Sequence, residues 1–172
     1  MILTDSDILL RYPETKDVAK ILSWENDVEN WLVSDTISPY SEEEIREFVE
    51  AGQDFFRDGQ KRLMMETSSK KLAGCIDVFD FDQKNRRASI GVLTEPDFRG
   101  KGIAKSALKL TEDFCFSQLE IHSLYAEVLE TNVPSRTLFE KSGFTMIGIK
   151  RDWLWDGFGY HDQVMYQKIV TQ

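Results

Sequence analysis

Apolar and polar positions follow two different periods along this chain, and these periods predict helices and strands in a defined order. Apolar spacing of three to four residues predicts four helices, which begin near residues 15, 42, 103 and 133. Alternation and short apolar runs predict seven strands, at residues 8–12, 63–67, 72–79, 87–94, 122–130, 144–155 and 160–169. The predicted order is therefore β-α-α-β-β-β-α-β-α-β-β.

Capping residues and glycines indicate where some of these helices begin and end. Ser41 followed by Glu44 has the spacing of a capping box, in which each residue hydrogen-bonds the backbone of the other. The apolar pattern carries this helix on to Phe55, with Gly52 weakening or ending it. Near the fourth helix, Gly143 suits the position just after the last turn.

The order of elements predicts the fold class. Hairpin-connected strands followed by a strand-helix-strand unit indicate a mixed sheet. We therefore expect an α/β (α+β) fold, with a mostly antiparallel central sheet of six to seven strands and helices on both faces. The chain has 172 residues, of which 41% are hydrophobic, and no linker-like stretch interrupts it. A single domain over residues 1–172 is the expectation.

Composition narrows the functional classes. The formal net charge is −9, which argues against nucleic acid as a partner, since phosphate backbones bind clustered Lys and Arg. Cys75 and Cys115 lack the spacing of a disulfide pair or of metal ligands, and the chain has only two histidines. A zinc site needs about four such ligands close together, so we expect no metal site. The first residues form no basic and apolar leader, and no stretch has the length of a membrane span. We expect a cytoplasmic protein without a membrane partner.

The segment most indicative of a ligand-binding site runs from Val92 to Ala104, where a strand leads into a glycine-rich turn that is followed directly by a helix. Gly100 and Gly102 let the backbone approach a ligand closely. The unpaired N–H groups of the first helical turn then favour an anion such as a pyrophosphate. The Walker pattern is absent, and the dinucleotide fingerprint fails at its third glycine, where Lys105 stands.

Two motifs together resemble the GNAT superfamily of N-acetyltransferases. The first is Arg99-x-x-Gly102-x-Ala104, and the second runs from Asn132 to Phe144 with the pattern Asn-x-x-Ser-Arg-x-Leu-Phe-Glu-Lys-x-Gly-Phe. The resemblance covers essentially the whole chain. Residues 86–88 and 155–162 are similar to the branch that contains spermidine N-acetyltransferases and ribosomal-protein N-terminal acetyltransferases.

This resemblance implies acetyl-CoA as co-substrate and an amine as acceptor, with a polyamine as the leading candidate. It implies that one strand binds the pantetheine arm through Val92, Leu93 and Thr94. It implies a pyrophosphate cradle made of Arg99, Gly100, Lys101, Gly102, Ile103, Ala104 and Lys105. It further implies that the far side of the channel is lined by Asn132, Ser135, Arg136 and Phe139.

The reaction itself asks for three kinds of group. The amine must lose a proton, because an alkyl ammonium with a pKa near ~10 is not nucleophilic at neutral pH. The thioester oxygen needs a donor, for which the backbone N–H of Leu93 is the candidate. The departing thiolate benefits from an acid. Many family members have a tyrosine where this chain has Phe139, so Ser135 or a water would have to protonate the sulfur; Ser135 could equally be a helix-start residue that satisfies a backbone N–H.

Three aspartates are candidates for the acceptor side. Asp77 sits between apolar neighbours, where a raised pKa would suit a base or an ammonium anchor. If the turn of residues 80–86 centres between positions 83 and 84, Asp80 opposes Arg87, which makes a cross-strand ion pair the simpler interpretation. The resemblance also aligns Asp80 with a polyamine-binding carboxylate of the spermidine enzymes. Asp35 is the third candidate anchor.

Two alternatives stay open. The acceptor could be a protein N-terminus instead of a small amine, or the chain could bind acyl-CoA without catalysis, which Phe139 makes conceivable. The sequence also leaves open a homo-oligomer and the choice of acyl chain.

Overall fold

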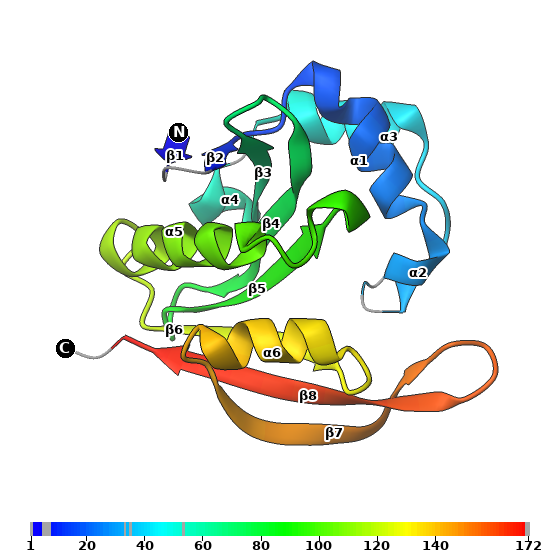
Figure 1. Cartoon of the computed structure of the whole chain (residues 1–172), viewed down its shortest axis with the longest axis vertical. Coiled ribbons are helices and arrows are strands. Elements are labelled where there is room, and N and C mark those ends of the chain that lie inside the picture. The colour runs from blue at the N-terminus through cyan, green and yellow to red at the C-terminus, as the bar shows by residue number, and fades with distance from the viewer. Residues whose placement is uncertain (1, 5–7, 33, 35, 53, 171–172) are drawn as a thin grey trace.

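The computed structural model describes residues 2–4, 8–32, 34, 36–52 and 54–170. These residues form one eight-stranded sheet in the order β1-β2-β3-β4-β5-β6-β8-β7 (Figure 1). The strands are β1 (Ile2–Thr4), β2 (Ile8–Arg11), β3 (Lys61–Thr67), β4 (Leu72–Asp82), β5 (Arg87–Thr94), β6 (Ser123–Leu129), β7 (Thr145–Trp155) and β8 (Tyr160–Ile169). All neighbours are antiparallel except β5 and β6.

The mixed, mostly antiparallel sheet with helices on both faces is confirmed, with one strand more than expected. The additional strand is β1, a three-residue edge strand that pairs with β2. A segment of this length is too short to show an alternating pattern, which is why the sequence did not predict it.

The helices are η1 (Thr15–Asp17), α1 (Val18–Glu25), α2 (Val28–Trp31), α3 (Glu42–Glu50), α4 (Phe55–Asp58), η2 (Pro96–Phe98), α5 (Ile103–Ser117) and α6 (Val133–Lys141). The four predicted helices are present, but α3 ends earlier than expected, and the short segments α2, α4 and η2 were not predicted. The capping box of Ser41 and Glu44 is present in full. The helix does not continue to Phe55, because Gly52 adopts a φ of +68° just after its end. Phe55 instead begins the separate one-turn helix α4.

Two apolar clusters hold helices against the opposite faces of the sheet. Neighbouring residues of β4 show the division, since successive side chains of a strand point to opposite faces. Ile76 belongs to the larger cluster, which includes Ala107 and Leu108 of α5. Cys75 belongs to the smaller cluster, with Ile21 of α1 and Ile45 of α3. No helix of the described residues is long and apolar enough to cross a membrane.

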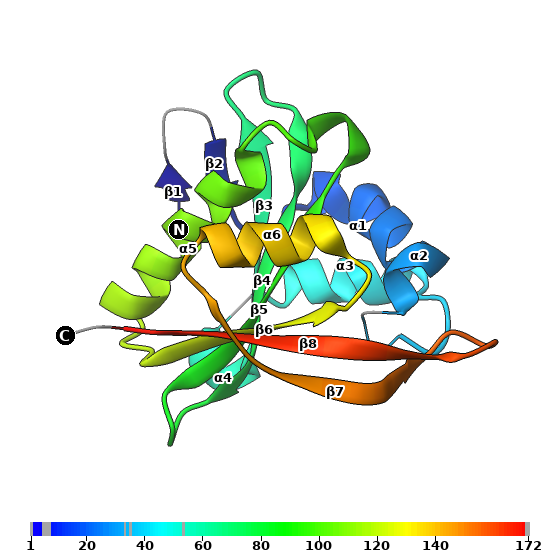
Figure 2. The same ribbon diagram turned by 60° about the horizontal axis from the view of Figure 1, so that its bottom comes forward.

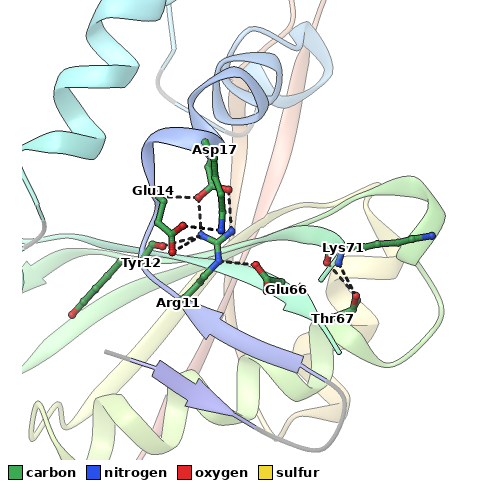
Figure 3. Close-up of polar contacts among 8 residues, drawn as sticks. Arg11, Tyr12, Glu14, Asp17, Glu66, Thr67 and Lys71 are labelled. Atoms are coloured by element: carbon green, nitrogen blue, oxygen red, sulfur yellow. Dashed lines mark hydrogen bonds and ion pairs between the residues drawn. The ribbon is translucent and has the colours of Figure 1, made fainter. Parts of the chain in front are cut away.

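A buried ion-pair network fixes the start of α1 on the sheet (Figure 3). Arg11, at the end of β2, donates to Asp17 through Nη1 and Nη2 at 2.7 and 3.0 Å, and to Glu66 of β3 through Nε at 2.8 Å. Burial alone would raise the pKa of Asp17, but the hydrogen bonds from Arg11 and from the Glu14 backbone outweigh it and lower that pKa. The network therefore anchors the helix that carries Trp24 and Glu25.

The parallel contact between β5 and β6 is short, and this opens the sheet. It consists of the pairs Arg87–Ser123, Ala88–Leu124 and Ser89–Tyr125. Beyond Ser89 the two strands diverge (Figure 2), and residues 90–94 of β5 have no strand partner on that edge within the described part of the chain. Helices α5 and α6 lie along this opening (Figures 1 and 2).

Candidate functional site

The glycine-rich turn after β5 has the geometry of an anion site. Gly100 and Gly102 adopt φ angles of +73° and +81°, which glycine reaches without strain. Gly102 is the N-cap residue of α5, and no side chain caps this helix. The first N–H groups of α5 are therefore available to a ligand, and the helix dipole favours a negative charge there.

The open edge of β5 contains Val92, Leu93 and Thr94, all of them half-buried. On its other edge, β5 pairs with β4, where Gly74 lies opposite Thr94. A side chain on Gly74 would collide with the carbonyl oxygen of Leu93, so glycine lets the two backbones approach this closely. The backbone of β5 is thus held firmly on one side and left unpaired on the other.

A contact that the sequence did not reveal ties α1 to this loop. The indole Nε1 of Trp24 donates to the carboxylate of Glu95, the residue that follows β5. Lys20 approaches the same carboxylate at 2.8 Å. Burial would raise the pKa of Glu95, but these partners outweigh it and lower the pKa. The pair could not be predicted, because 71 residues separate Trp24 from Glu95 and no local pattern marks either.

The second motif forms helix α6 beside the opening. The Asn132 side chain accepts a hydrogen bond from the backbone N–H of Ser135 at 3.1 Å and so caps the helix. The Ser135 hydroxyl is partly exposed and makes no hydrogen bond with the described residues. Arg136 is turned toward β8, where its Nε donates to the Tyr166 hydroxyl at 3.1 Å. The helix start therefore leaves Ser135 available, while Arg136 has a structural partner.

Phe139 lies in the core and not on the channel surface. It is 2% exposed and packs between Phe144 and Tyr166, with ring centroids at 5.1 and 6.3 Å. The expectation that it lines the channel is therefore corrected, since a ring with apolar partners on both sides has little surface left for a ligand. Tyr166, which the sequence did not single out, donates its hydroxyl to Glu140 at 2.7 Å.

Asp77 is not isolated among apolar side chains. Arg62 of β3 lies directly opposite and binds it in a bidentate pair, Nε to Oδ1 at 2.7 Å and Nη2 to Oδ2 at 2.8 Å. Glu25 of α1 accepts from the same guanidinium at 2.5 Å. The premise that Asp77 has only apolar surroundings is therefore wrong. Two carboxylates around one guanidinium still leave this cluster with an excess negative charge.

The predicted pairing of Asp80 with Arg87 is wrong. Between the pairs Phe79–Ser89 and Asp82–Arg87, β4 advances by one residue more than β5, which is a β-bulge. Asp80 sits in this bulge with a φ of +51°, and its side chain is exposed. Arg87 instead contacts Asp82, Nη2 to Oδ2 at 3.1 Å. Asp77 faces Gly91 across the β4–β5 ladder, whereas the predicted centre of the turn would have placed it opposite position 90. Asp35 lies outside the described residues.

Taken together, an eight-stranded mixed sheet, an opening beside β5 and a glycine-rich anion loop define an acyl-CoA acyltransferase architecture. The chain belongs to the family described as the acetyltransferase (GNAT) domain, which matches residues 7–145. The resemblance drawn from the two sequence motifs is thereby confirmed.

Similar proteins place the chain within this family. The spermidine N(1)-acetyltransferase of Escherichia coli strain K12 is 30% identical over 89 residues, which are 52% of this chain and 47% of that protein. A putative ribosomal N-acetyltransferase of Bacillus subtilis strain 168 is 35% identical over 101 residues, 59% of this chain and 55% of the relative. The chain thus spans about half the length of these curated relatives.

A solved structure shows the fold over nearly the full length. The crystal structure of spermidine N-acetyltransferase from Vibrio cholerae in complex with CoA and spermine superimposes with a TM-score of 0.83. The superposition covers 96% of each chain at 23% sequence identity. At this identity the likeness establishes the fold alone.

Proposed function

We propose that this protein is an acetyl-CoA-dependent N-acetyltransferase that acts on a primary amine of a small molecule, with polyamines as the leading acceptor class. The observation that carries the proposal is the unpaired edge of residues 90–94 of β5, which leads straight into the uncapped start of α5. An extended backbone edge suits an amide-containing arm, and the adjoining helix start suits a pyrophosphate.

The residues of the loop fit such a co-substrate. A Cβ built on Gly100 or Gly102 meets nothing within 4 Å, so space is open in front of the N–H groups of α5. Lys101 and Lys105 add positive charge in a chain whose net charge is −9. Acetyl-CoA supplies the activated acetyl thioester; the backbone N–H of Leu93 would stabilise the oxygen as it gains charge, and the hydroxyl of Ser135 would protonate the leaving sulfur.

The carboxylates on the other face of the sheet favour a cationic acceptor. Asp77 and Glu25 share one guanidinium, that of Arg62, so the cluster keeps an excess negative charge that attracts an ammonium group. Because both oxygens of Asp77 already accept from Arg62, we assign Asp77 first as an anchor for the acceptor and second as its base. Asp80 and Asp35 stay in the proposal as outer anchors.

Release of free CoA with a panel of amines tests the proposal. The panel contains polyamines, simple monoamines and peptides with free N-termini, and we expect turnover to be highest with the polyamines. Turnover with peptides alone would replace the proposal by Nα-acetylation of a protein terminus. Tight CoA binding without turnover of any amine would replace it by a non-catalytic acyl-CoA-binding module.

Self-association of the chain stays a prediction, which size-exclusion chromatography tests.

The substitution Asp77→Asn separates the two roles of Asp77. An anchor predicts a higher KM for the amine at every pH, whereas a base predicts a lower kcat that recovers at high pH, where the free amine is abundant. The matched control is Glu43→Gln, which removes an exposed carboxylate at the start of α3. Full activity of Asp77→Asn toward every amine that the parent accepts would exclude both roles.

A further inference from the structure

Glu95 lies where strand β5 leads into the glycine-rich loop, and backbone contacts hold this strand end in place. The residue stands between Thr94, the last residue of β5, and the short helix η2. Its N–H donates to the carbonyl oxygen of Ala73 at 2.9 Å. Arg99 returns to the same strand end, because its Nε donates to the carbonyl oxygen of Thr94 at 3.1 Å. These two contacts hold the strand end without using the Glu95 carboxylate.

The carboxylate of Glu95 contacts helix α1, which lies beside this loop (Figures 1 and 2). It accepts the hydrogen bond from the indole Nε1 of Trp24, a residue that is 6% exposed. A buried indole N–H needs an acceptor, because leaving it unpaired loses a hydrogen bond that water supplies in the unfolded chain. Lys20 contacts the same oxygen, but its side chain is 40% exposed, and exposed ion pairs contribute little. The bond from Trp24 is therefore the contact that fixes the end of α1 to the loop.

The residue next to Trp24 belongs to the proposed acceptor side. Glu25 accepts from Nη1 of Arg62 at 2.5 Å, and the same guanidinium binds Asp77, the proposed anchor for the amine. Trp24 and Glu25 are consecutive, so one peptide unit separates the contact with the loop from the contact with the carboxylate cluster. A shift of Trp24 relative to Glu95 would therefore move Glu25 relative to Asp77.

The end of α1 also holds α2, the helix that follows it. The carbonyl oxygen of Trp24 accepts from Nδ2 of Asn30 at 2.9 Å, and that of Glu25 accepts from Nε1 of Trp31 at 2.7 Å. Both donors are side chains of α2, a four-residue helix that is too short to be stable by itself. The position of α2 therefore depends on the last two residues of α1.

We propose that Glu95 is a positioning residue that acts through the indole of Trp24 and fixes Glu25 and α2 in the arrangement that receives the amine. The inference rests on the proposed acetyl transfer and adds a connection between its two substrates. The strand end that would hold the co-substrate also sets the acceptor side. Glu95 takes part in no chemical step, so its removal should weaken binding of the amine and leave the chemistry itself intact.

Steady-state kinetics with acetyl-CoA and spermidine test the effect on the acceptor side. Glu95→Ala and Trp24→Phe remove the acceptor and the donor of one hydrogen bond. Each should raise the KM for spermidine about fivefold or more, with kcat and the KM for acetyl-CoA within about twofold of the parent. The double variant should resemble either single variant, because both lose the same interaction. Glu95→Gln should keep the parent's KM for spermidine, since its amide oxygen still accepts from the indole.

The matched control is Ile21→Val, which weakens the packing of α1 without touching this hydrogen bond. Ile21 is fully buried in the same apolar cluster as Trp24, so losing one carbon from its side chain should lower Tm. Its KM for spermidine should nevertheless equal that of the parent. The comparison separates a specific effect on the acceptor side from general destabilisation of the helix.

Amide hydrogen exchange with and without CoA is a second measurement, and it needs no acceptor. Binding of CoA should slow exchange in the parent both at residues 95–102 and at residues 24–31, because the loop fixes the end of α1 through Glu95. Trp24→Phe should keep the slowing at residues 95–102 and lose it at residues 24–31. Glu95→Gln should show both effects, as in the parent.

The outcomes separate this inference from the proposed function. An unchanged KM for spermidine in Glu95→Ala and Trp24→Phe would overturn the inference and leave acetyl transfer intact. An equal rise of that KM in Ile21→Val, at an equal loss of Tm, would overturn it as well. CoA that binds but slows exchange only at residues 95–102 of the parent would have the same consequence. If calorimetry detects no binding of CoA, the proposed function is wrong and the inference falls with it.

Discussion

Gly74 offers the sharpest test of how the sheet positions the open edge of β5. This residue of β4 adopts a φ of +147°, a conformation that side chains rarely adopt. In Gly74→Ala the new methyl group would lie against the carbonyl group of Leu93, with the carbonyl carbon at 3.0 Å, and 2.6 Å from Cε of Met65. Met65 is fully buried, and Leu93 belongs to the backbone proposed to bind the thioester. Neither neighbour can move without disturbing the core or the site.

The expected loss of unfolding free energy in Gly74→Ala has two parts. Overpacking a filled core typically costs about 1–3 kcal/mol. Placing alanine in a backbone region reserved for glycine costs about 1–3 kcal/mol more. The total of about 2–6 kcal/mol is a large fraction of a typical unfolding free energy of roughly 5–15 kcal/mol. For a chain of this size, each kcal/mol lowers Tm by roughly 2–4 °C, so we expect a fall of roughly 4–24 °C.

Thermal unfolding and steady-state kinetics measure the two consequences. Gly74→Ala should lower Tm and, in the fraction that folds, raise the KM for acetyl-CoA, because β5 must shift to make room. Gly91→Ala is the control on the adjacent strand; its Cβ would lie 3.4 Å from the Phe79 ring, an ordinary contact, at a φ open to alanine. The reasoning fails if both variants show the same Tm and the same KM for acetyl-CoA.

Three further predictions concern the loop, the helix start and the buried network. Gly102→Asp adds a charge and a side chain at a φ of +81°, and should weaken CoA binding severely by calorimetry; unchanged affinity in a folded variant would remove the loop from the site. Ser135→Ala should lower kcat more than it raises the KM for acetyl-CoA, unless a water protonates the sulfur. Asp17→Asn should cost about 3 kcal/mol at pH 7, because it leaves Arg11 with one partner fewer in a buried site. Since the folded-state pKa of Asp17 is lowered, its stabilising effect is lost as pH falls through that pKa. The unfolding free energies of parent and variant, measured from denaturant curves, should therefore begin to converge as pH falls below the ordinary aspartate pKa of about 4.

Local sequence signals predicted those parts of the structure that local interactions determine. The alternation over residues 87–94 gave the bounds of β5 without error, and the capping residues placed the start of α3. The glycine-rich turn was found because Gly100 and Gly102 each serve a backbone need that no other residue meets as easily. These features depend on a few consecutive residues, so a single sequence contains enough information to predict them.

The errors came from pairings between distant residues. The contact of Arg62 with Asp77 follows from the β3–β4 register, and that register contains an irregularity that no residue type announces. The partner of Arg87 differs from the prediction by two positions: the bulge at Asp80 accounts for one, and the register of the rest of the β4–β5 hairpin accounts for the other. A one-residue shift in a strand exchanges the two faces, so small errors of register change which charges meet. The core position of Phe139 likewise depends on Tyr166, a residue from another element.

The short parallel contact between β5 and β6 divides the sheet into two sections that are each continuous in sequence. Strands β1 to β5 come from residues 2–94, and strands β6 to β8 come from residues 123–169, with α5 as the connection. Each section is antiparallel within itself, so only the three residue pairs between β5 and β6 join the two hydrogen-bond ladders. A co-substrate bound beside that junction would contact both sections at once. It would restrain local opening between them, so amide exchange at residues 87–89 and 123–125 should slow when it binds.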